Sequence, residues 1–106
     1  MTPETKLKGE VQDILTVYGL FWMRLQSGMV KVRGSWMHLC PPGTGDIVVF
    51  PQRGFWVGWI ELKRLKGKQR KSQVEFQAKA EAAGHPYLVA RSAEDVKTWL
   101  KENGAL

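Results

Sequence analysis

Apolar residues near the start of the chain recur at intervals of three and four, the spacing of one face of an α-helix. The residues of this face are Leu7, Val11, Ile14, Leu15 and Tyr18. Thr2 is a favoured N-cap residue, Pro3 suits the first helical position, and Gly19 is typical of a helix end. The pattern therefore predicts a helix over residues 3–19.

The middle of the chain has the apolar and β-branched runs that are typical of short strands. Residues 20–26 and 29–39 predict two strands joined by a turn at the Ser-Gly pair between them. After a loop rich in proline and glycine, residues 46–50 and 55–63 predict two further, buried strands.

Two helices are predicted in the last third of the chain, and each opens with a serine followed three positions later by an acidic residue. They are residues 72–83, with Ser72 and Glu75, and residues 92–103, with Ser92 and Asp95. A short strand over residues 87–90 is predicted between them.

The resulting order, α-β-β-β-β-α-β-α, predicts an α/β fold in which helices flank a central mixed β-sheet. The unit of strand, helix and strand near the end of the chain favours parallel pairing of residues 55–63 with residues 87–90. A length of 106 residues suits a single domain spanning residues 1–106.

Positive charge is concentrated in one segment of the chain. The net charge is +6, from 16 Lys and Arg against 10 Asp and Glu. Six of the cations fall within residues 63–71, which contain no acid: Lys63, Arg64, Lys66, Lys68, Arg70 and Lys71. Such a patch is typical of a protein that binds a polyanion such as nucleic acid. A solvated basic loop is the alternative.

Composition also excludes several classes of protein. The single cysteine, Cys40, rules out an intrachain disulfide. No apolar run approaches the roughly 18–20 residues that span a bilayer, and the N-terminus lacks the apolar stretch of a signal peptide. We therefore expect a cytoplasmic protein that is not secreted and has no membrane partner.

Two of the predicted strands carry carboxylates that are costly to bury without a partner. Asp46 opens one strand, and Glu61 lies near the end of the other, two residues before Lys63 and on the same face. If these strands pair, the two carboxylates meet, and with a backbone carbonyl and water they suit Mg²⁺ or Mn²⁺. A lysine beside such a site indicates metal-assisted hydrolysis of a phosphodiester. The alternative is a turn-capping aspartate and a surface Glu61–Lys63 ion pair.

Five short motifs follow one another along the chain. They are Glu-Val-Gln at 10–12, Gln-Ser-Gly at 26–28, Gly-Thr-Gly-Asp-Ile-Val at 43–48, Ile-Glu-Leu-Lys at 60–63 and Lys-Ser-Gln at 71–73. Their order and spacing resemble the PD-(D/E)XK nuclease superfamily, and within it the small stand-alone VRR-NUC (virus-type replication-repair nuclease) domain. The resemblance covers nearly the whole chain and implies a restriction-endonuclease-like core. The chain departs from the family's pattern at Gln26, where asparagine is expected, and at Gly45, where proline is frequent.

The resemblance implies a role for each matching residue of the two strands. Asp46 and Glu61 would bind the metal ion, and the backbone carbonyl of Leu62 would be a further ligand. Lys63 would position the attacking water.

Two helical residues would complete the catalytic set by the same resemblance. Glu10 would reach the metal, directly or through a water, and it lies at the margin of the apolar face of its helix. Gln73 would lie near the active site, at the head of the core-facing row of its helix. The alternatives are an exposed helix glutamate and a glutamine that bonds to nearby backbone.

The resemblance further implies a metal-dependent DNA endonuclease that cuts branched DNA such as four-way (Holliday) junctions, in a phage or a bacterium. The nucleic-acid-binding residues would be Arg64, Lys66, Lys68, Arg70, Lys71 and Ser72. A chain of this size would contact the backbone and shape of DNA more than its sequence.

Residues 20–40 are more apolar than one small core requires. The large apolar residues in this region are Phe21, Trp22, Met23, Met29, Trp36 and Met37. They would form the interface of a homodimer, which would present two active sites to two strands. For Trp36, core packing and base stacking are alternatives. Two other functions stay open: a nucleic-acid-binding module without catalysis, and a nuclease subunit that is active only with a partner protein.

Overall fold

The computed structural model describes residues 2–25, 29–38, 40–52 and 54–106. Its helices and strands are α1 (Pro3–Val17), β1 (Phe21–Arg24), β2 (Met29–Val32), β3 (Ser35–His38), β4 (Ile47–Phe50), β5 (Gly58–Leu62), α2 (Lys71–Ala82), β6 (Tyr87–Ala90) and α3 (Ala93–Glu102). The Gln-Ser-Gly motif at 26–28 lies outside the described residues.

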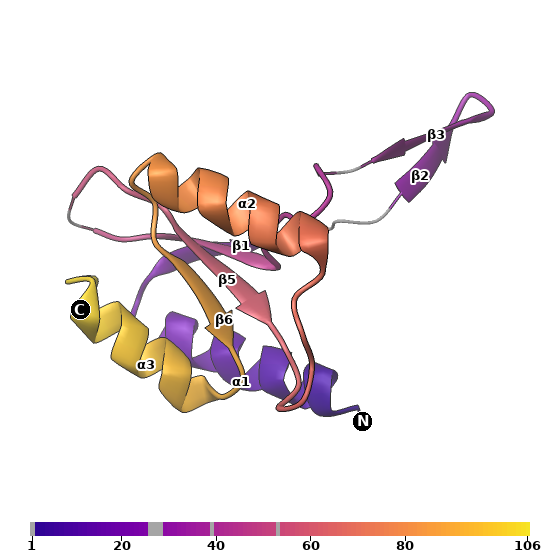
Figure 1. Ribbon diagram of the computed structural model, residues 1–106. Helices are drawn as coiled ribbons and strands as arrows, with labels where there is room; N and C mark the ends of the chain where they lie inside the picture. The colour runs from indigo at the N-terminus through magenta and orange to yellow at the C-terminus, as the bar shows by residue number, and fades with distance from the viewer. Residues whose placement is uncertain (1, 26–28, 39, 53) are drawn as a thin grey trace.

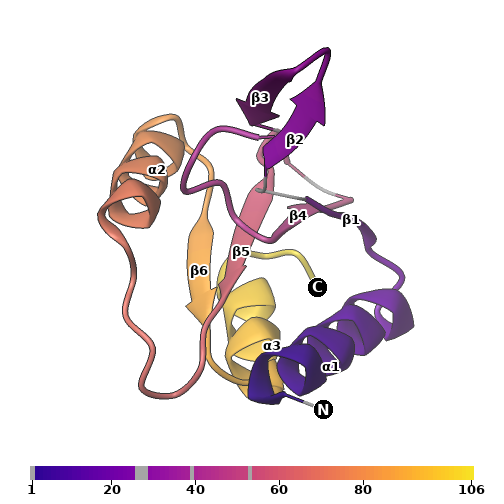
Figure 2. The same ribbon diagram turned by 90° about the vertical axis from the view of Figure 1, so that its right-hand side faces the viewer.

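Four strands form the central sheet, in the order β1-β4-β5-β6. β4 pairs antiparallel with β1 and with β5, whereas β5 and β6 are parallel. α1 and α3 lie on one face of this sheet, and α2 lies on the other (Figure 1 and Figure 2). The predictions of a mixed sheet flanked by helices and of a parallel crossover through α2 are therefore confirmed.

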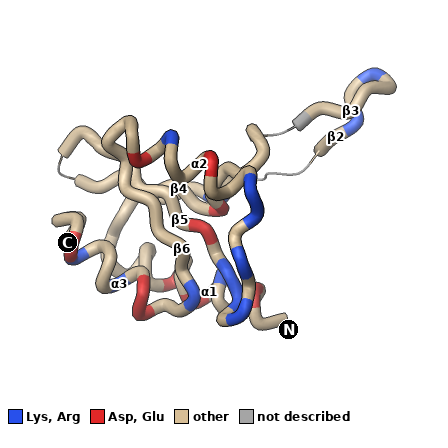
Figure 3. The backbone as a smooth tube through the Cα atoms, viewed as in Figure 1, with Lys and Arg blue, Asp and Glu red and all other residues tan. Residues whose placement is uncertain are grey.

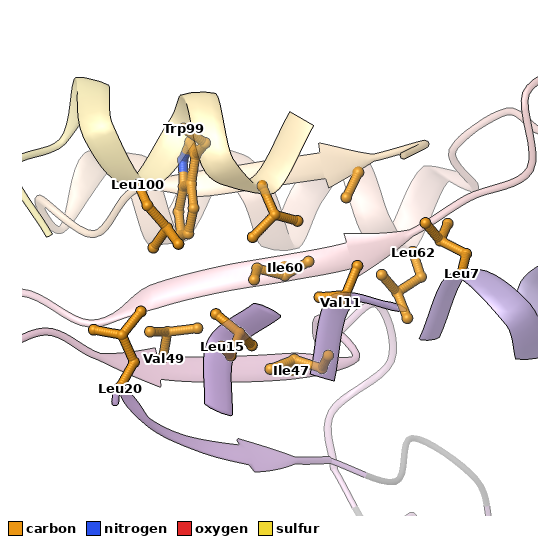
Figure 4. Packing of buried hydrophobic residues seen from close by; sticks show 12 residues of the cluster. Leu7, Val11, Leu15, Leu20, Ile47, Val49, Ile60, Leu62, Trp99 and Leu100 are labelled. Atoms are coloured by element: carbon orange, nitrogen blue, oxygen red, sulfur yellow. The ribbon is translucent and has the colours of Figure 1, made fainter. Parts of the chain in front are cut away.

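The hydrophobic core lies between the sheet and the layer of α1 and α3 (Figure 4). Alternate strand residues point into it, and the helices contribute residues spaced three and four apart. The strand residues of the core include Ile47, Val49, Ile60, Leu62 and Ala90, and the helical residues are Leu7, Val11, Leu15, Val96, Trp99 and Leu100. This packing fixes the register of β4 against β5, because a slip of one residue would turn every core side chain to the opposite face.

The other face of the sheet, beneath α2, is partly polar. Trp59 of β5 packs edge-to-face on Phe76 of α2, with ring centroids 5.0 Å apart. Because strand residues alternate between faces, Glu61 lies on the same side as Trp59. The sheet therefore divides an apolar core on one face from a face that carries a buried carboxylate.

The predicted caps of the first and last helices are confirmed. Thr2 Oγ1 accepts a hydrogen bond from the N–H of Thr5 at 3.2 Å. Ser92 and Asp95 form a capping box at the start of α3. Among the described residues, no helix combines the length and the apolar character that crossing a membrane requires.

The start of α2 differs from the prediction. The helix begins at Lys71, with Arg70 as its N-cap residue, so the capping box of Ser72 and Glu75 is wrong. The side chain of Gln73 caps the helix instead, since its Oε1 accepts a hydrogen bond from the N–H of Arg70 at 2.8 Å.

The strands predicted over residues 20–26 and 29–39 also differ in the structure, where the second of them is divided into two strands. β1 pairs with β4, and β2 and β3 form a separate hairpin. The chain reverses at Arg33 and Gly34, whose φ angles are 51° and 81°. Two consecutive positive φ angles are typical of a type I′ turn, for which Asn-Gly is the strong sequence signal and Arg-Gly is not. The order of elements thus contains one strand more than predicted.

Candidate active site

The pairing of β4 with β5 brings two carboxylates together. Ile47 lies opposite Ile60, so the preceding residue, Asp46, faces Glu61 where the ladder ends. Asp46 Oδ2 accepts a hydrogen bond from the N–H of Leu62 at 2.7 Å. Because the N–H and C=O of one strand residue point to the same side, the Leu62 carbonyl is directed toward the edge of β5 where Asp46 lies.

The Glu61 side chain is 1% exposed, and its two oxygens have different surroundings. Oε1 accepts hydrogen bonds from Tyr87 Oη at 2.6 Å and from Gln69 Nε2 at 3.0 Å. Oε2 is buried without a hydrogen-bond partner in the structure. Lys63 Nζ lies 3.7 Å from Oε2, which is beyond hydrogen-bond distance but close enough for electrostatic attraction. One oxygen is therefore fixed, and the other has no donor.

Burial and neighbouring charge change the acidity of two groups in this site. Burial raises the pKa of the Asp46 carboxyl above its ordinary value of 3.8, and the charge of Glu61 adds to this rise. The N–H of Leu62 and the charge of Lys63 lower the pKa of Asp46 in part. Burial and the hydrogen bond to Glu61 raise the pKa of the Tyr87 hydroxyl, so this hydroxyl remains a donor at neutral pH.

The oxygen atoms at this point of the sheet are suitable ligands for a hard divalent cation. Glu61 Oε2 is buried without a donor, and the Lys63 ammonium near it is beyond hydrogen-bond distance at 3.7 Å, so a cation that binds this oxygen directly would offset the cost of its burial. Within the described residues, no group of three or more His, Cys, Asp or Glu is placed to hold a metal ion. The protein ligands would therefore be two carboxylates and a backbone carbonyl. Mg²⁺ accepts such a set, because it usually retains several waters.

A pocket beside Asp46 contains a glutamate that the sequence analysis missed. Its lining residues are Thr2, Glu4, Thr5, Lys8, Arg24, Leu25, Asp46 and Leu62. Glu10 does not line this pocket and is exposed on α1. Glu4 is close enough for its charge to raise the pKa of Asp46.

Helical spacing is the signal that would have found Glu4. The buried residues of α1 are Leu7, Val11 and Leu15, which are four residues apart. Glu4 extends this row by one turn toward the N-terminus, so a polar residue heads the core-facing row. The motif at 10–12 contains Glu10 and not Glu4.

Gln73 lies near Asp46 on the α2 side of the site. A second pocket is lined by Pro42, Gly43, Thr44, Asp46, Arg70, Ser72 and Gln73. The pocket depends on Gly43, which has a φ angle of 85° and passes so close to Ser72 that a Cβ would meet its carbonyl oxygen. The structure thus brings Gln73 and Asp46 together, while Gln73 also bonds to the backbone of Arg70.

The basic residues follow the site directly along the chain. Figure 3 shows Lys and Arg along the connection between β5 and α2. The side chains of Arg64, Lys66, Lys68, Arg70 and Lys71 are exposed, and Ser72 is half-buried. We call residues 64–70 the basic loop.

Arg91 holds part of the basic loop in place. Its Nη1 donates hydrogen bonds to the carbonyl oxygens of Arg64, Leu65 and Gly67, at 2.6, 3.3 and 2.7 Å. At the other end of the loop, Gln69 donates to Glu61 and to Gln77. The loop is therefore anchored by Arg91 directly after β6, by Glu61 of β5 and by Gln77 of α2, and its cations are presented from a fixed backbone.

The chain forms a small α/β domain with a mixed four-stranded sheet, in which two carboxylates face each other where β4 and β5 cease to pair. A solved structure described as a "VRR_NUC domain" has this fold, with a TM-score of 0.68 and 18% sequence identity. The match covers 96% of this chain and 97% of the other. No protein-family model matches the sequence, and the comparison with curated proteins found no match. The expected VRR-NUC-like fold is therefore confirmed by structure, across nearly the whole chain.

The raised pKa of Asp46 predicts a stabilising substitution. At pH 7 and without metal, the ionised carboxylate is less favourable in the folded chain than in the unfolded one. We therefore expect Asp46→Asn to raise the midpoint of thermal unfolding at pH 7 in EDTA. The difference should shrink as the pH falls toward 3.8, where the unfolded chain also takes up the proton.

Asp13→Asn is the matched control, because Asp13 is exposed on α1 and its substitution should change the midpoint little. An Asp46→Asn protein that unfolds at a lower temperature than the wild type at pH 7 would contradict the prediction. It would mean that the ionised carboxylate stabilises the fold.

Proposed function

We propose that this protein is a metal-dependent DNA endonuclease that hydrolyses phosphodiester bonds, with branched DNA such as four-way junctions as its substrate. One observation carries the proposal: Glu61 Oε2 is buried without a donor, beside Asp46 and on the strand that leads into the basic loop. A module that only binds DNA has no use for acids beside the phosphates that it attracts. The likeness in fold to a VRR_NUC domain supports the same function.

Asp46, Glu61 and the carbonyl of Leu62 would hold Mg²⁺ or Mn²⁺ in this proposal. When bound, the cation supplies a Lewis acid that offsets phosphate charge and lowers the pKa of a water. Asp46 is held for this role by the N–H of Leu62, and Glu61 by Tyr87 and Gln69.

Lys63 would position the water that attacks the phosphorus atom. Its side chain is 12% exposed and its ammonium faces Glu61 Oε2, so it points into the site and not toward bulk solvent. An ammonium has three N–H donors, so it can orient a water and a phosphate oxygen together. The water loses a proton as its oxygen bonds to phosphorus, the bond from phosphorus to one sugar oxygen breaks, and that leaving oxygen takes up a proton from water. Gln73 would contact water or phosphate on the α2 side of Asp46.

The basic loop would bind the phosphates that flank the scissile bond. Its exposed cations contact the DNA backbone, which positions a duplex without reading its sequence. Selectivity would therefore come from DNA shape, which favours branched substrates. The salt dependence of binding measures this contribution, since the slope of log affinity against log salt falls by about 0.9 for every phosphate that the protein no longer neutralises.

Residues 20–40 would bind a second copy of the chain. Large exposed apolar side chains in this region are Phe21, Met23, Met29, Val30, Val32, Trp36 and Met37. Among the described elements, β2 and β3 contact only each other, and the hairpin extends away from the sheet (Figure 1). An isolated two-stranded hairpin is marginally stable, so burial against a partner would stabilise it. Two subunits would also supply the two active sites that cutting both strands requires.

Static light scattering tests this arrangement, with twice the mass of one chain as the expected result. Trp36→Ser, which shortens an exposed apolar side chain of the hairpin, should shift the protein toward monomer. A wild-type protein that is monomeric at micromolar concentration would contradict the homodimer.

Cleavage of labelled DNA tests the proposed activity. We expect metal-dependent cutting in Mg²⁺ or Mn²⁺ and none in EDTA, with a four-way junction cut faster than flap, duplex or single-stranded DNA. Asp46→Ala and Lys63→Ala should reduce the cleavage rate by about 100-fold or more, because each removes a group that acts on the reacting atoms. Binding to the junction in EDTA should persist in both variants.

The matched controls are Asp13→Ala and Lys101→Ala, which remove exposed charges from α1 and from the last turn of α3. Full activity of Asp46→Ala would refute the assigned site. Tight binding without cutting on any substrate would favour a binding module, or a nuclease that needs a partner protein.

The two glutamates of α1 can be separated by one pair of variants. Glu4 and Glu10 are both exposed on α1, but only Glu4 lines the pocket beside Asp46. We therefore expect Glu4→Gln to slow metal-dependent cleavage by about 10-fold or more, the scale of losses for residues that support a metal site. Glu10→Gln should cut at nearly the wild-type rate. The opposite result would mean that Glu10, and not Glu4, acts in catalysis.

A further inference from the structure

Glu61 receives both of its side-chain hydrogen bonds on one oxygen. Tyr87 Oη and Gln69 Nε2 both donate to Oε1, at 2.6 and 3.0 Å, while Oε2 has no donor. A carboxylate in water would accept hydrogen bonds on both of its oxygens. The asymmetry therefore comes from the placement of these two donors by the fold.

Both donors are themselves held by other elements. Gln69 Nε2 also donates to Gln77 Oε1 of α2 at 2.9 Å. Tyr87 is buried on β6, and its ring lies against Phe76 of α2 with centroids 6.0 Å apart. The hydroxyl and the amide thus approach Oε1 from β6 and from the basic loop, and α2 supports both.

The terminal torsion of a glutamate is soft, so an unrestrained carboxylate turns readily. Two donors on Oε1 remove this freedom and leave Oε2 as the oxygen that faces Lys63. Both donors are neutral, so they fix the carboxylate without cancelling the negative charge that would attract a cation.

We propose that Tyr87 and Gln69 are positioning residues that hold the Glu61 carboxylate so that Oε2 is free to bind the divalent cation. The inference rests on the proposed function, because it assumes that the site binds such a cation. It adds two residues to the site, from a strand and a loop that carry no metal ligand. Neither residue touches the reacting atoms.

The binding of Mn²⁺ to the full-length protein tests the inference. Electron paramagnetic resonance of free Mn²⁺ gives the dissociation constant without DNA or cleavage. Loss of a hydrogen bond behind a metal ligand weakens metal affinity by about 10–100-fold. We expect a rise of this size in the dissociation constant for Tyr87→Phe and for Gln69→Leu.

Tyr18→Phe is the matched control, because it removes a hydroxyl from the chain's other tyrosine, at the C-cap of α1. Its dissociation constant for Mn²⁺ should equal that of the wild type. Thermal unfolding in EDTA shows whether each variant folds. If Tyr87→Phe does not fold, Gln69→Leu still tests the inference.

The outcomes separate the inference from the proposed function. If the wild type binds Mn²⁺ and the folded variants bind it equally well, the two residues only satisfy a buried carboxylate, and the inference is overturned. If the wild type binds no Mn²⁺, or if Glu61→Gln binds it as well as the wild type, the proposed metal site itself is wrong.

Discussion

The Glu61 carboxylate is the buried charge around which the site is arranged. Transfer of an unpaired carboxylate from water to a protein interior costs far more free energy than one side-chain contact contributes. The chain offsets this cost with a tyrosine hydroxyl, a glutamine amide and a lysine at 3.7 Å, which come from β6, the basic loop and the end of β5. The position of the basic loop, the packing of α2 on the sheet and the pairing of β5 with β6 together place these groups around the Glu61 carboxylate.

The two faces of the sheet differ: one holds the apolar core that stabilises the fold, and the other carries residues of the candidate site. The face toward α1 and α3 holds the apolar core and fixes the register that sets Asp46 opposite Glu61. The other face carries Trp59, Glu61 and Tyr87 beneath α2, and Arg91 fastens the basic loop beside it. A raised pKa at Asp46 means that the fold bears a cost for this carboxylate in the absence of a cation. Such a cost is typical of functional sites.

Local patterns in the sequence predicted the structural features that depend on residues close together along the chain. The helices, the parallel crossover and the meeting of Asp46 with Glu61 follow from periodicity and strand pairing. The hairpin of β2 and β3 was missed because Arg33 adopts a positive φ angle that its residue type disfavours. Tyr87 and Arg91 were missed because their partners lie 24 or more residues away in sequence, and spacing along the chain carries no signal for such contacts.

The most direct test of this account is a crystal structure of the protein soaked in Mn²⁺, with data collected at a wavelength that gives anomalous scattering from manganese. We expect one anomalous peak between Asp46 and Glu61, within bonding distance of Oε2 of Glu61 and not of its Oε1, with the hydrogen bonds of Tyr87 and Gln69 retained. An empty site at millimolar Mn²⁺, or a peak on Oε1 with those hydrogen bonds broken, would contradict it.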